Sequence, residues 1–299
     1  MEAFLALVGL AEFLAILSSV SYGGTQALVR LGMRNATPFG AALVINGCTA
    51  TGGIILSLWD GTLLASTFWP LFWYAVIGVT GPGIGRLTSF IGIARIGLSR
   101  STTISSSTPI WGIAFAVLIL HESPSLGVVL GTLAVVAGVA ILTPSEGERE
   151  RLGGWLQGAL IYPLLCSLAY ALPPVFNKLA YAHQETPYVG MAVAFSTGNL
   201  VILAFKGAMP GQVKLAVGRQ ARPWLLAGGA LSCLSSIFLW NALLLGSVST
   251  TLPLSRMVPL WVLLISYFFM GRIERITRRD VGATLLVAAG GVLITAFRG

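Results

Sequence analysis

Two arginines, Arg86 and Arg256, lie inside stretches that are otherwise apolar and long enough to cross a membrane. A guanidinium group in hydrocarbon is costly, so it normally faces a cavity or a partner. Arg86 follows the run Gly-Pro-Gly-Ile-Gly at 81–85, which should kink or unwind the helix and free backbone N–H groups for an anion. Arg86 is therefore either an anion-binding residue of a cavity or a structural residue at a kink, paired or reaching a lipid headgroup.

Arg256 lies between two prolines of the same apolar stretch, Pro253 and Pro259. Two prolines in one helix bend it and free carbonyl groups. Arg256 also lies about two turns from the end of its stretch, which is too deep for its side chain to reach the membrane surface easily. We therefore expect Arg256 to face a cavity and to pair with an anionic group there, with a structural ion pair as the alternative.

Other residues at mid-span could line a path for a solute beside these arginines. The expected substrate-binding set is completed by aromatic walls and amide side chains: Tyr22, Tyr170, Trp240, Gln26, Asn46 and Asn241. Hydrogen bonds between helices are the alternative role for each polar group, including Ser105, Ser106 and Asn199. The two histidines have no second ligand at metal spacing, so we expect no metal site, no cofactor and no catalytic residue.

Glu12 is the acidic residue closest to the interior of an apolar stretch. If the first helix begins near Ala11, the carboxylate lies at the membrane interface and needs no special role. If the helix also includes residues 4–10, Glu12 is a candidate site for coupling to a proton or cation. Both readings stay open.

The composition places these residues in a polytopic membrane protein. Of 299 residues, 56% are hydrophobic and 9% are charged, with a mean hydropathy of +0.86, whereas a soluble domain has about 25% charged residues. Apolar runs of about 20 residues, the length of one crossing, occupy 11–32, 38–58, 70–93, 102–120, 126–142, 155–178, 188–205, 224–245, 250–270 and 281–297. We expect an all-α protein of ten transmembrane helices, which excludes a cytosolic enzyme, a secreted disulfide scaffold and a DNA-binding module. The cysteines Cys48, Cys166 and Cys233 are expected to be small core residues.

The basic residues of the connections are strongly biased to one side. Loops after the odd-numbered runs hold Lys and Arg at 30, 34, 95, 100, 149, 151, 206, 214, 219, 222, 272, 275, 278 and 279, whereas the other side holds only Lys178 and Arg298. Basic loops face the cytoplasm. The count therefore predicts both termini outside, and the net charge of +8 reflects cytoplasmic loops rather than a nucleic-acid partner.

The two halves of the chain repeat each other. Residues 22–30 match 170–178, Pro109-Ile110-Trp111 matches Pro259-Leu260-Trp261, and Glu122 matches Glu274. Five runs per half is an odd number, so the two copies must have opposite orientations. We expect domains at 1–147 and 148–299 that form inverted five-helix repeats with the substrate site where they meet.

These motifs resemble the EamA type of the drug/metabolite transporter superfamily. The resemblance rests on an aromatic-Gly pair with a basic residue eight positions later (Tyr22, Gly23 and Arg30), on the mid-helix prolines Pro109 and Pro259, and on Glu122 and Glu274 at the following turns. It implies a ten-helix bundle of two inverted repeats around a central cavity. Two features depart from it: His121 and Ile273 replace the usual Gly before each Glu, and the family places both termini in the cytoplasm. Distant relatives that export lipophilic cations have a carboxylate where this chain has Tyr22, which disfavours that substrate class.

We expect a secondary transporter, an exporter or exchanger of small polar metabolites such as amino acids or organic anions, working by alternating access. Two intramembrane arginines favour an anionic or zwitterionic substrate. The alternative is an integral-membrane enzyme or lipid-processing protein, which would need a cluster of His, Asp or Glu at one bilayer face. The expected location is the cell membrane (plasma or inner), in contact with lipid, as a monomer or weak dimer.

Overall fold

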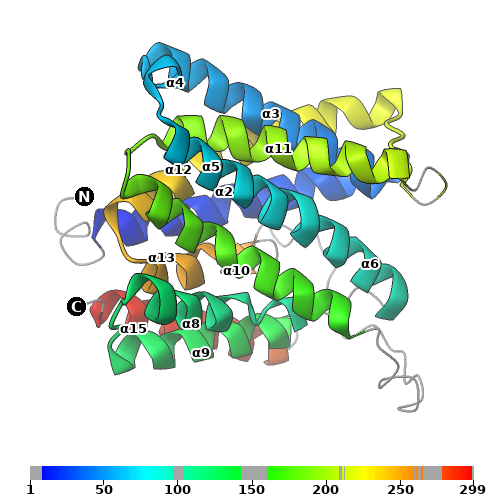
Figure 1. The fold of residues 1–299 in the computed structure, drawn as a ribbon. Coiled ribbons are helices and arrows are strands. Elements are labelled where there is room, and N and C mark those ends of the chain that lie inside the picture. Colours follow the sequence, from blue (N-terminus) through cyan, green and yellow to red (C-terminus); the bar gives the residue numbers. More distant parts are fainter. Residues whose placement is uncertain are drawn as a thin grey trace.

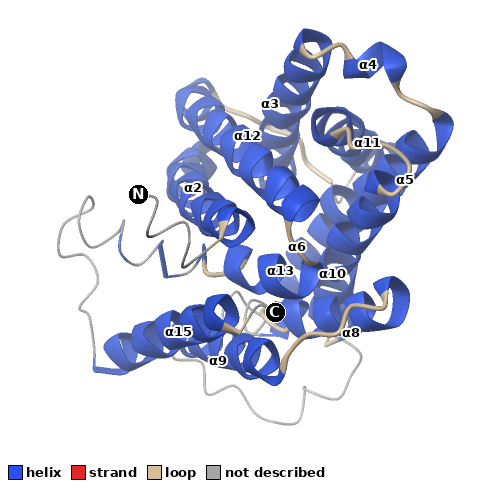
Figure 2. Cartoon of the chain, turned by 90° about the vertical axis from the view of Figure 1, so that its left-hand side faces the viewer, coloured by secondary structure: helices blue, strands red, loops and turns tan. Residues whose placement is uncertain are grey.

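The computed structural model describes residues 9–96, 104–142, 160–208, 211, 213–258, 260–261, 264 and 278–297. In this part of the chain, helices are joined by loops and turns, and there are no strands (Figure 2). An isolated antiparallel bridge joins Ala36 and Val217. The expectation of an all-α protein is confirmed for these residues.

The helices follow the apolar runs closely. Those of the first half are α2 (Leu10–Gly32), η1 (Met33–Asn35), α3 (Pro38–Trp59), α4 (Thr62–Ala65), α5 (Phe68–Gly78), η2 (Val79–Gly85), α6 (Arg86–Ile96), α8 (Thr108–Leu120) and α9 (Leu126–Leu142). Those of the second half are α10 (Ile161–Tyr181), α11 (Pro187–Ala208), η4 (Arg219–Ala221), α12 (Arg222–Leu245), α13 (Val248–Ser255) and α15 (Arg278–Ala296).

Three of the described helical segments are long and apolar enough to cross a bilayer: Pro38–Trp59, Pro187–Ala208 and Arg219–Leu245. Large apolar side chains also point away from the bundle, among them Ile55, Leu118 and Leu285, each more than half exposed. Apolar surface on this scale is stable in lipid rather than in water. The protein is therefore an integral membrane protein.

Helices from the two halves pack against one another in pairs. Figures 1 and 2 show α2 beside α12, α3 beside α11 and α9 beside α15. Helix α10 of the second half likewise packs against α5, η2, α6 and α8 of the first half. The described helices of the two halves are thus interleaved, so residues of both meet in the middle of the bundle.

The Gly/Pro run before Arg86 changes the winding of its helix. Residues Val79–Gly85 form a turn of π-helix that contains Pro82, and α6 begins at Arg86. Proline cannot donate the backbone hydrogen bond of a regular helix. At Gly81 a Cβ atom would lie 2.9 Å from Cγ of Pro173 on α10, so glycine permits this close approach. The predicted distortion of this helix is confirmed.

A second break lies directly before Arg256. Helix α13 contains Pro253 and ends at Ser255, and the backbone N–H of Arg256 donates to the Pro253 carbonyl oxygen at 3.1 Å in a tight turn. The expected interruption is thus present on the Pro253 side. Pro259, Glu274 and the domain boundary between 147 and 148 lie outside the described residues.

Helix α13 begins at a cap supplied by the first half of the chain. The Glu122 carboxylate accepts hydrogen bonds from the backbone N–H groups of Val248 and Ser249, at 2.8 and 2.9 Å, and from the Ser249 hydroxyl at 2.6 Å. A carboxylate at a helix N-terminus pairs with unsatisfied N–H groups and with the positive end of the helix dipole. This cap anchors the short helix that ends at Arg256.

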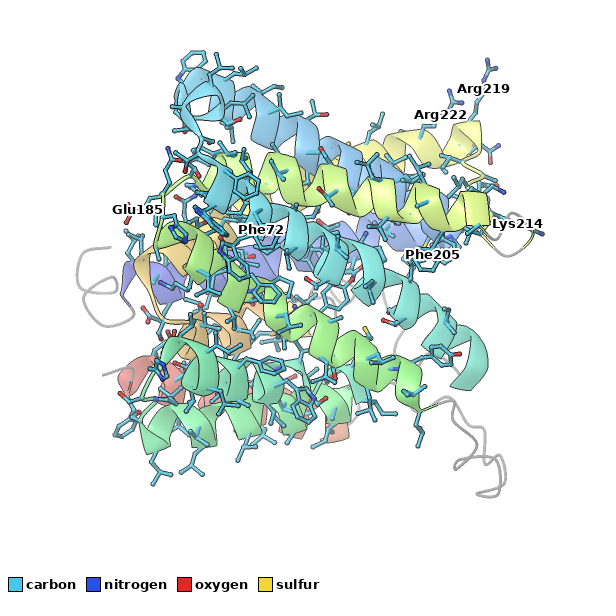
Figure 3. All side chains as sticks on the ribbon, in the orientation of Figure 1. Phe72, Glu185, Phe205, Lys214, Arg219 and Arg222 are labelled. Atoms are coloured by element: carbon cyan, nitrogen blue, oxygen red, sulfur yellow. The ribbon has the colours of Figure 1, made fainter. Side chains whose placement is uncertain are left out.

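Helix α2 begins, and α15 ends, at the same end of the bundle (Figure 1). Lys214, Arg219 and Arg222 lie at the opposite end, while Glu185 lies at the first (Figure 3). Glu12 is in the first turn of α2, two residues after its start, and is 6% exposed. Lys214, Arg219 and Arg222 therefore lie at the end of the bundle opposite to the start of α2 and the end of α15.

Candidate functional site

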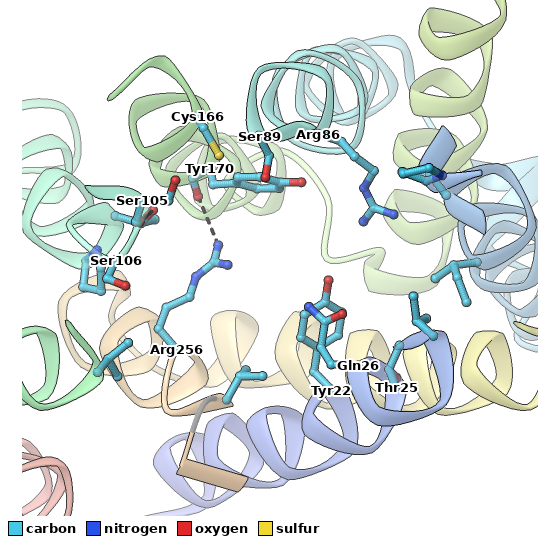
Figure 4. Close-up of a pocket in the computed structure, with 18 of the residues that line it drawn as sticks. Tyr22, Thr25, Gln26, Arg86, Ser89, Ser105, Ser106, Cys166, Tyr170 and Arg256 are labelled. Atoms are coloured by element: carbon cyan, nitrogen blue, oxygen red, sulfur yellow. Dashed lines mark hydrogen bonds between the residues drawn. The ribbon is translucent and has the colours of Figure 1, made fainter. Parts of the chain in front are cut away.

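Two adjoining cavities lie at the centre of the bundle. The larger, of about 350 Å³, is bordered by α2, α3, α6, α8, α9 and α10, and the smaller, of about 160 Å³, by α2, η2, α10, α11, α12 and α13. Both are lined by Tyr22, Arg86, Tyr170 and Arg256 (Figure 4). Four residues predicted from the sequence, which come from both halves of the chain, thus meet at the junction of the cavities.

Arg256 is held against Tyr170 on α10. Its Nη2 donates to the Tyr170 backbone carbonyl oxygen at 3.4 Å, and its Cζ lies 5.5 Å from the centroid of the same residue's ring. Its Nε is buried and has no hydrogen-bond partner among the described residues. A buried charged donor without an acceptor is costly, so this guanidinium can bind an acceptor at the junction.

Arg86 lies across the junction from Arg256. Figure 4 shows both guanidinium groups pointing into the space between α2 and α10, with the Tyr170 ring between their side chains. In the part of the chain that the structure describes, no aspartate or glutamate lines either cavity. Two cations without a facing acid create a positive potential in a site of low dielectric constant, and an anion of a solute would balance it.

Two further predicted residues reach the cavities. Gln26, one turn after Tyr22 on α2, lines the larger cavity. Trp240 lines the smaller one, is 5% exposed, and lies 5.7 Å from Tyr74 between ring centroids. Trp240 therefore adds an aromatic side chain to the lining of the smaller cavity.

The structure does not place Asn46, Asn241 or Glu12 at either cavity. Asn46 is fully buried on α3. It does not line the cavity although its neighbour Ile45 does, because successive side chains of a helix point about 100° apart. Asn241 donates to the Ile237 carbonyl oxygen at 2.8 Å, one turn earlier in α12, as expected for a helix-packing amide.

Helix α10 adds two lining residues that the sequence reasoning missed, Cys166 and Asn177. Cys166 borders the larger cavity rather than serving only as a small core residue, and Asn177 borders the smaller. Both lie at helical spacing from Tyr170, one turn before it and two turns after it, on the same face. This helical spacing from Tyr170 is the sequence signal from which Cys166 and Asn177 could have been predicted.

Among the residues that the structure describes, no three of His, Cys, Asp and Glu come close enough together to hold a metal ion. The exposed His121 lies at the left-handed turn that ends α8 (φ 55°), and His183 stacks on Trp69 with 6.1 Å between ring centroids. The described polar groups of the cavities are suited to binding a solute by charge and hydrogen bonds.

Comparisons with known proteins agree with this architecture. Residues 9–143 match the EamA-like transporter family. The chain is 31% identical over 70 residues to the chloroplastic phosphoenolpyruvate/phosphate translocator 2 of Arabidopsis thaliana, a match that covers 23% of this chain and 18% of that protein. A protein of known crystal structure superposes with a TM-score of 0.78 over 95% of this chain and 98% of its own, at 17% identity, which shows the fold.

The resemblance seen in the sequence motifs is thereby confirmed. Together with the central cavity, the family match over residues 9–143 and the short match to a translocator support a membrane transporter of the drug/metabolite type. The EamA-like transporter family is thus the family whose model matches residues 9–143 of the chain.

Proposed function

We propose that the protein is a secondary transporter of small polar metabolites that carry a negative group, an exporter or exchanger that works by alternating access. The observation that carries this proposal is the unpaired Nε of Arg256, buried at a junction that also holds Arg86 and is lined by no described acid. A substrate anion would satisfy that donor. The name of the Arabidopsis relative, a phosphoenolpyruvate/phosphate translocator, supports the same charge preference.

We further propose ten spans arranged as inverted repeats at 1–147 and 148–299. Helix contacts support this because they come in reciprocal sets. In the proposed repeat, α2 of the first half corresponds to α10 of the second. Helix α2 packs on α12 and α13, and α10 packs on the corresponding first-half elements, the α5–η2–α6 helix and α8. Helix α3 packs on its own counterpart α11, and α9 packs on its own counterpart α15. An experimental structure should superpose the halves by a rotation of about 180° about an axis in the membrane plane, with Tyr22 on Tyr170. A superposition about the membrane normal would contradict the proposal.

Alternating access is supported by the different closure of the two ends. The larger cavity reaches Met33 and Pro38, at the end of the bundle that carries Lys214. The Lys214 end also has a contact between the halves, the Ala36–Val217 bridge. At the other end the contacts lie beyond the lining of either cavity: Tyr74 hydrogen-bonds to Thr186 at 3.0 Å, and Glu122 caps α13. A solute could thus enter from one side, and these contacts would have to break for it to leave by the other.

Substitution of Arg256 tests the proposed function. In liposomes containing the purified protein, uptake of labelled organic anions should saturate, and Arg256→Gln should weaken apparent binding about tenfold to a hundredfold, the equivalent of about 1.5–3 kcal/mol for a hydrogen bond to a charged group. Arg256→Lys should restore part of the loss, because a point charge cannot reproduce the guanidinium fork.

Arg222→Gln, at an exposed arginine of α12, is the matched control and should transport normally. Normal transport by Arg256→Gln would contradict the anion-binding role. Should Arg256→Gln fail to reach the membrane folded, the same comparison at Arg86 decides the question.

A further inference from the structure

The smaller cavity contains a second unsatisfied polar group besides Arg256. Asn177 is 2% exposed, lines this cavity, and its Oδ1 is buried without a hydrogen-bond partner in the described chain. Leaving a buried carbonyl oxygen unpaired is costly. The Nε of Arg256 lacks an acceptor and the Oδ1 of Asn177 lacks a donor, so the cavity can bind a solute that carries both an acceptor and a donor.

The neighbouring Tyr181 explains why the oxygen of the Asn177 amide, and not its nitrogen, remains without a hydrogen-bond partner. The Tyr181 hydroxyl donates its hydrogen to the Trp240 backbone carbonyl oxygen at 3.0 Å. It also interacts with the Asn177 side chain, one turn earlier on α10. Because its hydrogen is already used, Tyr181 can only accept from Asn177. The amide N–H therefore faces Tyr181, and Oδ1 is available to the cavity.

Two serines of the same cavity, Ser235 and Ser255, also offer acceptors rather than donors. The Ser235 hydroxyl donates to the Ser18 carbonyl oxygen at 2.9 Å, and the Ser255 hydroxyl donates to the Leu252 carbonyl oxygen at 2.7 Å. A hydroxyl group has a single hydrogen to give. At these two serines, as at Asn177, an entering group can pair only as a hydrogen-bond donor.

We propose that the substrate is a short hydroxylated organic anion, whose negative group binds Arg86 and Arg256 and whose hydroxyl donates to Asn177 Oδ1. This inference rests on the proposed function and names the substrate class of the same site. A hydroxyl fits better than an ammonium group because two guanidinium groups line the cavity and no described acid does, so a second cation would be repelled.

The spacing along α10 limits the length of the substrate. Asn177 lies seven residues after Tyr170, about 10 Å along the helix axis, and the Tyr170 carbonyl group holds the Arg256 guanidinium. A short solute whose negative group and hydroxyl are only a few bonds apart can therefore lie between the two positions. A carboxylic acid with a hydroxyl on its third carbon is such a solute.

Three compounds of almost equal shape test the proposal: 3-hydroxybutyrate, butyrate and 3-aminobutyrate. They compete against a labelled organic anion for uptake into liposomes that contain the protein. The hydroxy acid should compete about tenfold more strongly than butyrate, because only it pairs with the buried oxygen. It should also compete more strongly than the amino acid. Equal competition by 3-hydroxybutyrate and butyrate would overturn the proposal, and so would a preference for 3-aminobutyrate.

Variants of Asn177 test whether this residue causes the preference for 3-hydroxybutyrate over butyrate. Asn177→Leu should abolish the advantage of 3-hydroxybutyrate while keeping butyrate competition and its dependence on Arg256. Asn177→Asp keeps the shape and adds a negative charge, so it should shift the preference toward 3-aminobutyrate. Asn199→Leu is the matched control, since Asn199 also has a buried, unpartnered Oδ1 in the described chain but lines neither cavity.

The outcomes separate this inference from the proposed function. If anions are transported and Arg256→Gln impairs their transport, but Asn177→Leu retains the hydroxyl preference, the inference fails alone. If no anion is transported and Arg256 is irrelevant, the proposed function fails. Should Asn177→Leu not fold, Asn177→Asp and the competition series on the unmodified protein decide.

Discussion

The Arg256 guanidinium lies over the ring of Tyr170, 5.5 Å from its centroid, and donates to the backbone carbonyl oxygen of that same residue. One tyrosine thus holds the arginine by its ring face and by its main chain. These two contacts leave Nε directed away from protein acceptors in the described chain. The pairing joins the end of α13 to the middle of α10 and places the positive charge at the junction of the two cavities.

Replacing the Tyr170 ring should loosen this arginine. Tyr170→Leu removes the aromatic face under the cation, which is worth about 0.5–2 kcal/mol, so anion binding should weaken by about twofold to thirtyfold. Tyr170→Phe keeps the ring and should retain most of the affinity. Competition for labelled anion uptake in liposomes measures both variants. An equal loss in the two would assign the effect to the hydroxyl group and contradict a role for the ring.

The Glu122 cap of α13 should contribute measurably to stability. Glu122→Gln removes the charge and one of the accepting oxygens that bind Val248 and Ser249, so the free energy of unfolding should fall by about 1–2 kcal/mol. Thermal unfolding of the detergent-solubilised protein would show a lower midpoint. Glu185→Gln, at an exposed glutamate of the same end, should leave the midpoint unchanged. Equal midpoints for the two variants would show that the cap is dispensable.

The crossing of α3 and α11 depends on glycine at position 53. A Cβ atom there would lie 2.6 Å from the Ala192 backbone N and 2.9 Å from the Tyr188 carbonyl oxygen. Backbone atoms cannot move aside cheaply, so Gly53→Ala should destabilise the protein by about 1–3 kcal/mol. Gly207→Ala, where a Cβ meets nothing within 4 Å, should be neutral or slightly stabilising. A stable Gly53→Ala variant would mean that the helices separate freely.

The excess of basic residues in one set of loops predicts the orientation in the membrane. In a variant whose native cysteines are replaced by alanine, a cysteine at Lys214 should be protected from impermeant thiol reagents in intact cells, and one at Glu185 should be labelled. These exposed residues lie at opposite ends of the bundle (Figure 3). The reverse labelling pattern would place both termini in the cytoplasm, as the family resemblance implies.

The sequence alone determined the helices and the breaks that matter for the site. Apolar runs of membrane length predicted α3, α11 and α12, and α9 occupies the expected 126–142. The winding change before Arg86 and the helix end before Arg256 followed from Pro82 and Pro253, because a missing backbone N–H acts within a few residues of the chain. Local chemistry of this kind needs no knowledge of the fold.

Tertiary structure decided which polar residues face the cavities. Asn46 and Asn241 looked as suitable as Gln26 in the sequence, yet only Gln26 reaches a cavity. The direction of a side chain depends on the rotation of each helix against its neighbours. In a helix that is apolar on every side, as α3 is, the sequence carries little signal for that rotation.

The same reason explains Asn177 and the cap of α13. Helical spacing alone puts Asn177 on the same face of α10 as Tyr170, but only the packing of α10 between the first-half helices and α12 makes that face border a cavity. Glu122 was recognised as a residue at a turn, but its partner Ser249 is more than a hundred positions away. Contacts between distant segments come from packing the two halves together, and no local pattern of residues specifies them.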